Sequence, residues 1–425
     1  MKEEDKIKIE HALDALLDNI SENMLDCQKF EYYSPFLKFI SYKKNKIHRQ
    51  SRRCIYPKCT KRTIKKSHSI PKSASLNIIS ENGHVLKPDF DEYGKELKVK
   101  IKSVGINNAS AFPGFCEEHE RLFSIYENDA KIDTYKKALL QSYRAICREI
   151  VVRKNDRFVL NQLYREYKDV LEKESLKCVK GLLKNLIELG EIKQIKIDGG
   201  DGLLLNFEKQ IKYINKVIVT LEDYSDTIIS EITSDTKSSD LILSALTIDY
   251  VLPIALCGFA NSELQVNGSR TEFTLIMNIV PINKETYIIC ATNKKNKEIF
   301  DEYMKFCHQH HLSVLNMVES FMIFGSDHWF IQPSKWHTLP DDRKEILLAD
   351  ILQSNESFLE MYPLSIFDEA RKTFIDLFLR NTKDRKLTNI EKDFIDREKN
   401  KLYGHINRRI IGEDELIQKL YKHIE

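Results

Sequence analysis

The stretch CIYPKCTKRTIKKSHSIPKS, which runs from Cys54 to Ser73, holds two cysteines, one histidine and six lysines and arginines, but no acidic residue. The whole chain of 425 residues has a formal net charge of only +2. Between Tyr32 and Ser80 there are thirteen lysines and arginines and no aspartate or glutamate. The positive charge of an otherwise balanced chain is therefore concentrated around this stretch.

A run of like charges is often only a solvated face of a protein. Here the run contains aromatic residues such as Tyr42 and Tyr56 and surrounds a set of candidate metal ligands. These features favour a polyanionic partner, and we expect nucleic-acid phosphates to bind here. The candidate phosphate-binding residues are Arg52, Arg53, Lys58, Lys61, Arg62, Lys65, Lys66 and Lys72.

Two short pairs of residues have the spacing of zinc ligands. Cys54 and Cys59 form the first pair, and Cys116 and His119, at the start of an expected helix, form the second. A structural zinc site takes four such ligands in a tetrahedron. The alternative is that these residues are reduced, non-ligating thiols and a surface histidine, because either pair alone would be weak evidence for a zinc site. The 56 residues between the pairs predict an insertion around NGHVLKPDFDEYGKELKVKIKS.

The sequence His-x-x-Pro, with His68 and Pro71, lies between the two pairs. The order of a cysteine pair, His-x-x-Pro and Cys-x-x-ligand at a helix start resembles the HNH endonucleases. The core of that family is a ββα-metal, treble-clef zinc fold. The resemblance covers roughly residues 50 to 127, under a fifth of the chain.

The resemblance implies roles for three residues. His68 falls where the family keeps its general base, which deprotonates an attacking water, and an imidazole suits that task. Glu120 stands at the place of a metal-binding histidine and would hold a catalytic Mg²⁺ or Mn²⁺. Asn108, or its neighbour Asn107, is the candidate for the family's middle asparagine.

The sequence departs from the family pattern at four points. Ser67 replaces the usual aspartate, His119 the second cysteine and Glu120 the last histidine, and the asparagine stands farther from Cys116 than usual. Two interpretations follow from the motif: a divergent nuclease that uses His68 and Glu120, or a treble clef that binds nucleic acid without cutting it. A histidine that only donates a hydrogen bond within a turn is the simplest alternative for His68.

The patterns along the chain predict an α+β protein, in which a zinc-stabilised domain is followed by helices, a small antiparallel β-containing domain and a helical C-terminus. TEFTLIMNIVP and TYIICATN, with a polar turn between them, predict a hairpin, and ALTIDYVLPIALCGF predicts a further strand. HWFIQPSKW is either a binding edge or the margin of a core. The expected parts are a helical arm (1–49), the HNH-like domain (50–127), a helical region (128–235), an α+β domain (236–345) and a C-terminal helical region (346–425).

The composition of the chain limits the classes of protein to which it can belong. Nine cysteines in 425 residues are too sparse for a disulfide scaffold. No apolar run approaches the roughly 20 residues that span a bilayer, and the first residues lack the order of a signal peptide. We therefore expect a cytoplasmic protein.

The sequence is compatible with three functions. The first is a metal-dependent endonuclease acting on phosphodiester bonds, with DNA as the expected substrate and, by analogy with multidomain HNH-type proteins, a role in bacterial defence against phage or foreign DNA. The second is a non-catalytic, zinc-dependent nucleic-acid-binding protein. The third is a zinc-stapled scaffold protein. The C-terminal region could form a homo-oligomer or contact a protein partner.

Overall fold

The computed structural model describes residues 50–91, 98–182, 184, 202–234, 240–266, 269–351 and 357–403. The fold is α+β with an antiparallel sheet, as the sequence predicts. The chain divides into two compact units. Of the described residues, 50, 150–182, 184 and 202–220 belong to the first unit, and 51–91, 98–149 and those from 221 onward belong to the second. The predicted N-terminal arm, residues 1–49, lies outside the described residues.

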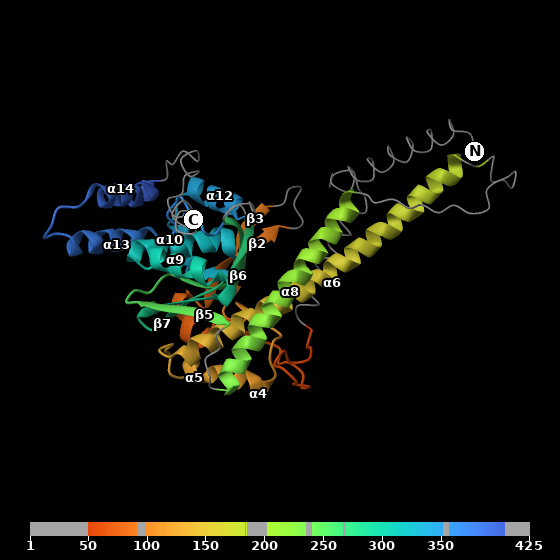
Figure 1. The fold of residues 1–425 in the computed structure, drawn as a ribbon, viewed down its shortest axis with the longest axis horizontal. Helices are drawn as coiled ribbons and strands as arrows, with labels where there is room; N and C mark the ends of the chain where they lie inside the picture. Colours follow the sequence, from red (N-terminus) through yellow and green to blue (C-terminus); the bar gives the residue numbers. More distant parts are fainter. Residues whose placement is uncertain are drawn as a thin grey trace. The chain divides into compact units, whose positions relative to one another are not determined.

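The second unit is built on an antiparallel sheet with the strand order β3-β2-β9-β6-β7-β8-β5 (Figure 1). The predicted hairpin is confirmed, because β7 pairs with β8 up to Ile282 opposite Glu285. The bounds of the strands are β2 His84–Asp91, β3 Lys98–Gly105, β5 Leu241–Ile248, β6 Ile254–Val266, β7 Ser269–Ile282, β8 Glu285–Asn293 and β9 Trp329–Ile331.

Successive apolar side chains of β6 are buried in two different cores. Ile254 and Leu256 belong to the main apolar core, whereas Ala255 and Cys257 belong to a smaller apolar core. Successive side chains of a strand point to opposite faces, so the two cores lie on opposite sides of the sheet. Near-continuous apolar runs such as IALCGF are what a strand buried on both faces requires.

Helices cover the main face of the sheet (Figure 1). Leu315, Phe374 and Ile395 supply apolar side chains from three of them. Trp329 and Trp336 are buried in the same core, and Trp329–Ile331 of HWFIQPSKW forms the interior strand β9. The helices of this layer are α9 Lys297–Cys307, α10 His311–Ser320, α11 Pro333–His337, α12 Asp341–Asp350, α13 Asp368–Asn381 and α14 Asn389–Tyr403, and the π-helical turn η4 Phe321–Gly325 follows α10.

The basic stretch Cys54–Ser73 packs, through Ile70, against the face of the sheet that carries the smaller apolar core. Ile70 packs there with Leu76 of the turn η1 (Lys72–Leu76), Ile79 of the short helix α3 (Asn77–Ile79) and Ala145 of α6 (Tyr135–Leu182). Because these side chains are almost fully buried, the His-x-x-Pro segment is fixed against the sheet. The sheet therefore positions the candidate site.

The first unit consists, in its described part, of α6 from Ile150 onward and of α8 (Gly202–Ser234) up to Thr220. Tyr167, Leu171 and Leu204 form its apolar core. The hydroxyl of Tyr164 on α6 donates to Glu208 on α8 at 2.8 Å. These long helices agree with the helical region predicted after residue 128.

The predicted insertion forms β2 and β3, which pair with each other over their whole length. β2 also pairs with β9 through Leu86 and Ile331. One sheet therefore contains strands from the predicted zinc-binding domain and from the predicted α+β domain, while the exact boundaries between domains stay predictions. No described helix is long and apolar enough to cross a membrane.

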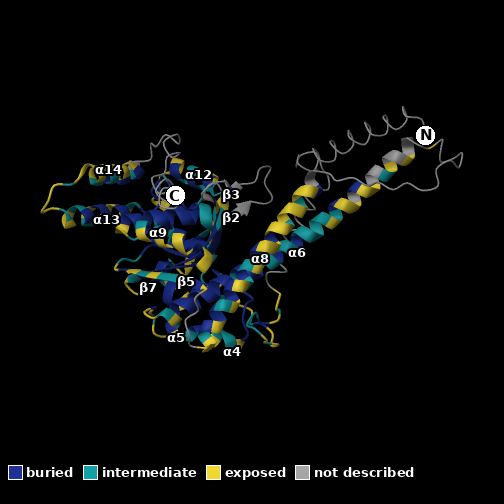
Figure 2. Cartoon of the chain, in the orientation of Figure 1, coloured by how far each residue is buried: buried dark blue, intermediate teal, exposed yellow. Residues whose placement is uncertain are grey.

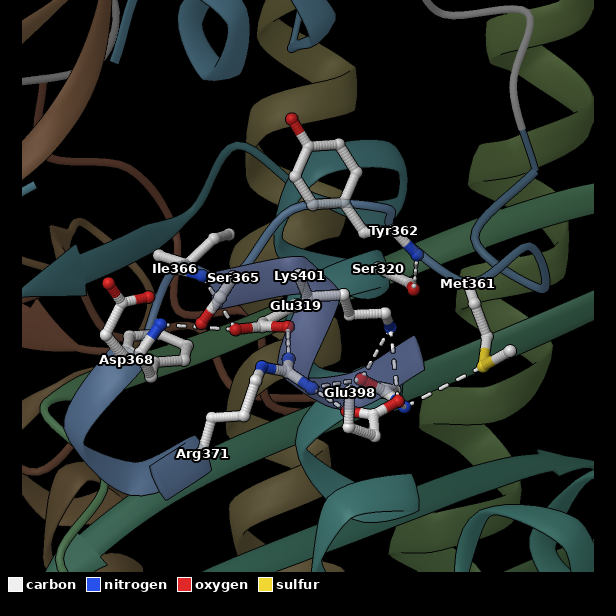
Figure 3. A network of polar contacts seen from close by, with 12 residues as sticks. Glu319, Ser320, Met361, Tyr362, Ser365, Ile366, Asp368, Arg371, Glu398 and Lys401 are labelled. Atoms are coloured by element: carbon white, nitrogen blue, oxygen red, sulfur yellow. Dashed lines mark hydrogen bonds and ion pairs between the residues drawn. The ribbon is translucent and has the colours of Figure 1, made fainter. Parts of the chain in front are cut away.

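A buried network of charges connects α10, α13 and α14 (Figure 3). The guanidinium of Arg371 on α13 forms ion pairs with Glu319 on α10 and Glu398 on α14. It also donates to Asn316 at 2.9 Å, and Lys401 donates to the same amide oxygen at 2.8 Å. Two cations and two carboxylates thus balance one another inside the helical layer.

Candidate metal centre

The four predicted zinc ligands meet in space. The Sγ atoms of Cys54, Cys59 and Cys116 and the His119 Nδ1 atom lie within 4.8 Å of one another. Cys116 Sγ is 3.2 Å from His119 Nδ1 and 3.9 Å from Cys59 Sγ. A tetrahedral zinc with Zn–S bonds of about 2.3 Å places its ligand atoms about 3.5–3.8 Å apart. The donor set and its spacing therefore fit a metal ion, and they are compatible with structural zinc.

Local backbone geometry brings the first pair of cysteines together. The amide of Cys54 donates to the Lys61 carbonyl at 2.9 Å, and that of Cys59 donates to the Tyr56 carbonyl at 3.1 Å. Lys58 adopts a positive φ of 61°, a left-handed conformation that tight turns use. The sequence YPK thus forms a knuckle with both sulfurs on one side.

The second pair begins a helix. Cys116 is the N-cap residue of α4 (Glu117–Glu120), and its amide donates to Cys54 Sγ at 3.3 Å. His119 lies one turn into this helix and stacks on the ring of Tyr56, with centroids 3.9 Å apart and planes 9° from parallel. The helix start and the stacked ring hold the imidazole toward the three sulfurs.

The pKa values of three of the four candidate ligands are shifted from their ordinary values. Burial raises the pKa of the Cys54 thiol to about 12. Burial also opposes ionisation of Cys116, but hydrogen bonds from the backbone amide of His119 and from the neighbouring thiols lower its pKa below the ordinary value. Burial lowers the pKa of His119, which keeps its imidazole neutral. Because thiolates and neutral imidazoles are the species that bind zinc, a divalent cation would complete the ionisation of the sulfurs.

His68 lies on β1 (Ser67–His68), which pairs with β4 (Ala111–Phe112). Its Nδ1 atom is 2.9 Å from the carbonyl oxygen of Ala109. A carbonyl only accepts, so Nδ1 carries the hydrogen and Nε2 keeps its lone pair. Burial, aided by the charges of Arg144 and Lys72, lowers the pKa of His68 to about 4, against a weaker opposing effect of the Ala109 hydrogen bond. The imidazole is therefore neutral at pH 7 and fixed in one tautomer.

Glu120 is engaged by an arginine that the motif does not predict. Arg144 of α6 is buried and forms ion pairs with Glu120 and Glu127. Its guanidinium lies 4.5 Å from the ring centroid of Phe123. Nothing in the local sequence indicates this contact, because Arg144 stands in a helical stretch whose neighbours are apolar.

The surroundings of Glu120 do not fit the expected catalytic metal. One of its carboxylate oxygens is bound by Arg144, and a divalent cation on the other would stand beside a guanidinium and be repelled by it. In the described part of the chain, the group formed by Cys54, Cys59, Cys116 and His119 is the one in which three or more ligand-type side chains converge. Among the described residues, the surroundings of Glu120 therefore do not form a group of metal ligands.

The two candidate asparagines accept hydrogen bonds from basic residues of the stretch Cys54–Ser73. Lys66 donates to Asn108 at 2.7 Å and Lys72 to Asn107 at 3.3 Å. Lys61 forms an ion pair with Glu118, which offsets part of its charge. Seven of the eight predicted phosphate-binding residues are exposed, and Arg52 is half-buried. The predicted basic side chains are thus at the surface, Lys72 acts electrostatically on His68, and several of the basic side chains already have protein partners.

Comparison of the chain with protein-family models, with curated proteins and with solved structures finds no match.

Proposed function

We propose that this chain hydrolyses phosphodiester bonds of nucleic acids at His68, within a treble-clef, HNH-like domain. The observation that carries the proposal is the state of His68, a neutral imidazole whose Nδ1–H is fixed on the Ala109 carbonyl. The exposed lysines Lys65, Lys66 and Lys72 lie near it in sequence and could bind a phosphate. A neutral imidazole with an oriented Nε2 lone pair can accept a proton from a water that attacks a phosphodiester, and its lowered pKa makes it a weaker base than an ordinary histidine.

Zinc would be held by Cys54, Cys59, Cys116 and His119 and would supply folding energy rather than chemistry. The knuckle bridge between Arg53 and Arg62, the pairing of β1 with β4 and the helix that starts after Cys116 support the treble-clef interpretation. Such a scaffold would fix the strand β1, which carries His68. The cytoplasmic location expected from the sequence is part of this proposal, and so is, by analogy with multidomain HNH-type proteins, a role in defence against phage or foreign DNA.

In the proposed hydrolysis, His68 acts as the general base and neighbouring lysines stabilise the developing charge. Nε2 of His68 takes a proton from a water molecule, and the water oxygen forms a bond to phosphorus. The bond from phosphorus to the leaving oxygen breaks, and that oxygen takes a proton from solvent. Lys66 and Lys72 would stabilise the charge that develops on the phosphoryl oxygens. The products are a phosphate monoester and a free hydroxyl group.

A second candidate is a zinc-dependent nucleic-acid-binding protein without cleavage activity. The ion pair between Glu120 and Arg144 favours it, because this carboxylate is the one that the resemblance assigns to the catalytic metal. The basic stretch Cys54–Ser73 would then bind the phosphate backbone alone. Its signature is an affinity that falls with salt and no cut products.

Substitution of His68 by alanine tests the proposal. Purified wild type should cut plasmid DNA or RNA in assays with Mg²⁺, Mn²⁺ or EDTA, and His68→Ala should lower the rate about 10²- to 10⁴-fold, the usual contribution of a general base. His84→Ala is the matched control, because His84 is exposed and its Nδ1 contacts only the backbone of Asn82. If wild type and His68→Ala are equally inert on every substrate while zinc stays bound, the nuclease proposal fails and the binding protein remains.

The pH dependence of cleavage should reflect the burial of His68. A general base must be neutral, so the rate should fall as pH drops through its pKa. Because that pKa is lowered to about 4, kcat/KM of wild type should stay nearly constant from pH 8 down to about pH 5, well below the ordinary histidine value of about 6.5. A profile that loses half its value near pH 6.5 or above would contradict the assignment of His68 as the base.

A further inference from the structure

The helices α10, α13 and α14, which belong to the layer over the main face of the sheet (Figure 1), line a cleft with a volume of about 340 Å³. Along α13, buried residues such as Phe374 and Phe378 alternate with exposed ones (Figure 2), and these two rings form an apolar floor together with Leu312. His310 and His311 also line the cleft and are exposed to solvent. Small-ligand pockets have volumes of about 300–1,000 Å³, so the cleft has the size for a small planar ligand.

Phenylalanine rings hold the two imidazoles of the cleft in place. The ring of His310 stands edge-on to Phe378, with centroids 5.0 Å apart and planes at 86°. It is also 5.7 Å from the ring of Phe394. The ring of His311 lies 5.2 Å from Phe374, with planes at 43°. Because these contacts restrict the rotation of both imidazoles, the cleft has a preorganised aromatic surface.

Uncharged polar groups of the cleft are available to a ligand. In the described part of the chain, no hydrogen bond engages the ring nitrogens of His310 and His311 or the side-chain amides of Gln309 and Asn381. Burial lowers the pKa of His310, against a smaller opposing effect of Glu391, so its imidazole is neutral at pH 7. A neutral imidazole offers one donor and one acceptor, and an amide also offers both. The cleft thus presents donors and acceptors beside an aromatic surface.

The charged residues that line the cleft neutralise each other. The guanidinium of Arg385 donates twice to the carboxylate of Glu391, once at 2.7 Å. That carboxylate also accepts from the amide of Thr388 at 2.8 Å and from its hydroxyl at 3.0 Å. Among the described residues, no three metal-ligand side chains converge at this cleft. Neither a bare anion nor a metal cation therefore finds an excess of opposite charge here.

We propose that this cleft binds a nucleobase, which stacks on the imidazole rings and is recognised along its edge by the ring nitrogens and the two amides. The base belongs to a free nucleoside or nucleotide, or to an unpaired strand. Every base has a π-face that stacks on aromatic side chains. Its edge carries several donors and acceptors. This combination of a planar face and a polar edge matches what the cleft presents.

The cleft is separate from the proposed cleavage site. Phe374 belongs to the main apolar core, whereas Ile70, two residues after His68, belongs to the smaller core on the other side of the sheet. A base in the cleft is therefore not the substrate held at His68. The inference adds a second site and does not depend on cleavage by the first.

Two other occupants fit the cleft less well. An aromatic side chain of a protein partner would also stack, but phenylalanine has no polar edge, and tyrosine and tryptophan carry one hydroxyl or one N–H group. Such a side chain would leave most of the polar groups of the cleft without a partner. A bare phosphate would need a cation that is not already paired, and Arg385 is bound to Glu391. A nucleobase is the occupant that uses both the rings and the polar groups.

The test is calorimetric titration of the full chain, without added divalent metal, with the common ribonucleoside 5′-monophosphates, their nucleosides and ribose 5-phosphate, which lacks a base. At least one nucleoside should bind, its monophosphate should bind about equally well, and salt should change neither affinity much, because no charge in the cleft is unpaired. Ribose 5-phosphate should not bind. His311→Ala should weaken binding about five-fold or more through lost stacking, and Asn381→Ala about two- to ten-fold through a lost hydrogen bond. Asn381 is exposed at the end of α13, so its variant decides the outcome if His311→Ala is unstable.

Two control variants should leave the affinity for nucleosides unchanged. His337→Ala removes an exposed histidine that does not line the cleft. Lys65→Gln/Lys66→Gln alters the basic stretch Cys54–Ser73, so a failure of the proposed nuclease is distinguishable from a failure of this site.

Labelled oligo(dA) and oligo(dT) identify the source of the base. If only oligonucleotides bind, and His311→Ala and Asn381→Ala weaken that binding, the base comes from a strand and the cleft is confirmed as its site. Affinities for nucleosides, nucleotides and oligonucleotides that are equal in wild type and in both variants overturn the inference. Absence of binding by all three, up to about 1 mM for the small probes, overturns it as well. Binding of ribose 5-phosphate as strong as that of the nucleotides would indicate an anion site and would also contradict it.

Discussion

Cys116→Ser is expected to release the metal and unfold the segment that the metal organises. Cys116 is buried, supplies one of the four ligand atoms and occupies the N-cap position of α4. Structural zinc contributes about 10–16 kcal/mol of apparent binding free energy in zinc-finger peptides near pH 7, whereas whole domains are stable by only about 5–15 kcal/mol. Loss of the site should therefore lower the melting temperature strongly. The measurements are zinc content per chain by mass spectrometry and thermal unfolding by circular dichroism.

The matched control is Cys290→Ala. Cys290 is also buried, but it lies on β8 in the main apolar core, away from the four ligands. Its substitution should lower stability modestly and leave the zinc content at one ion per chain. A Cys116→Ser protein that keeps its full zinc content and melting temperature would disprove the assignment of the metal centre.

The ligand set could be predicted from the sequence because each half is local. Cys54 and Cys59 bracket one turn, and Cys116 and His119 stand one helical turn apart, so spacing alone constrains their geometry. The joining of the two halves depends on tertiary structure, but the chemistry of thiols and imidazole restricts the ways in which they can be combined. The structure brings them within 4.8 Å.

Arg144 could not be predicted in the same way. Its partners Glu120 and Glu127 lie 24 and 17 residues earlier in the chain. Surface arginines and buried ones look alike in sequence, and the apolar neighbours of Arg144 only indicate a buried helix face. The pairing that changes the interpretation of Glu120 is therefore visible only in three dimensions.

Not every strand of the sheet could be predicted correctly from the sequence. ALTIDYVLPIALCGF predicts one strand, but it covers the end of β5 and the start of β6. These two strands lie far apart in the sheet, β5 at one edge and β6 in the interior. Residues 249–253 between them break the run, and Pro253 cannot donate to a ladder. Strand identity follows from local alternation, whereas strand order follows from long-range pairing.

Arg371→Met is expected to cost about 3–5 kcal/mol of unfolding free energy, since removing one partner of a buried ion pair leaves an uncompensated charge. Arg371 and Glu319 are fully buried, and Glu398 nearly so. Glu319 also accepts the backbone amides of Ile366 at 2.8 Å and Phe367 at 3.2 Å, so it holds the start of α13 as well. Urea unfolding at pH 7 measures the loss. Arg385→Met, which breaks an exposed ion pair with Glu391, is the control and should leave the stability nearly unchanged.

The loss in Arg371→Met should shrink as the pH is lowered from 7 towards 5. Burial raises the pKa of Glu319 even with Arg371 in place, and removing the cation raises it further. A carboxyl whose folded pKa lies above its unfolded value binds more protons when folded, so stability falls as pH rises between the two values. Glu319→Gln in the Arg371→Met background should recover part of the loss, because an amide oxygen can still accept from Ile366 and Phe367. Strictly additive effects of the two substitutions would show that the charges do not interact, and would contradict the network in Figure 3.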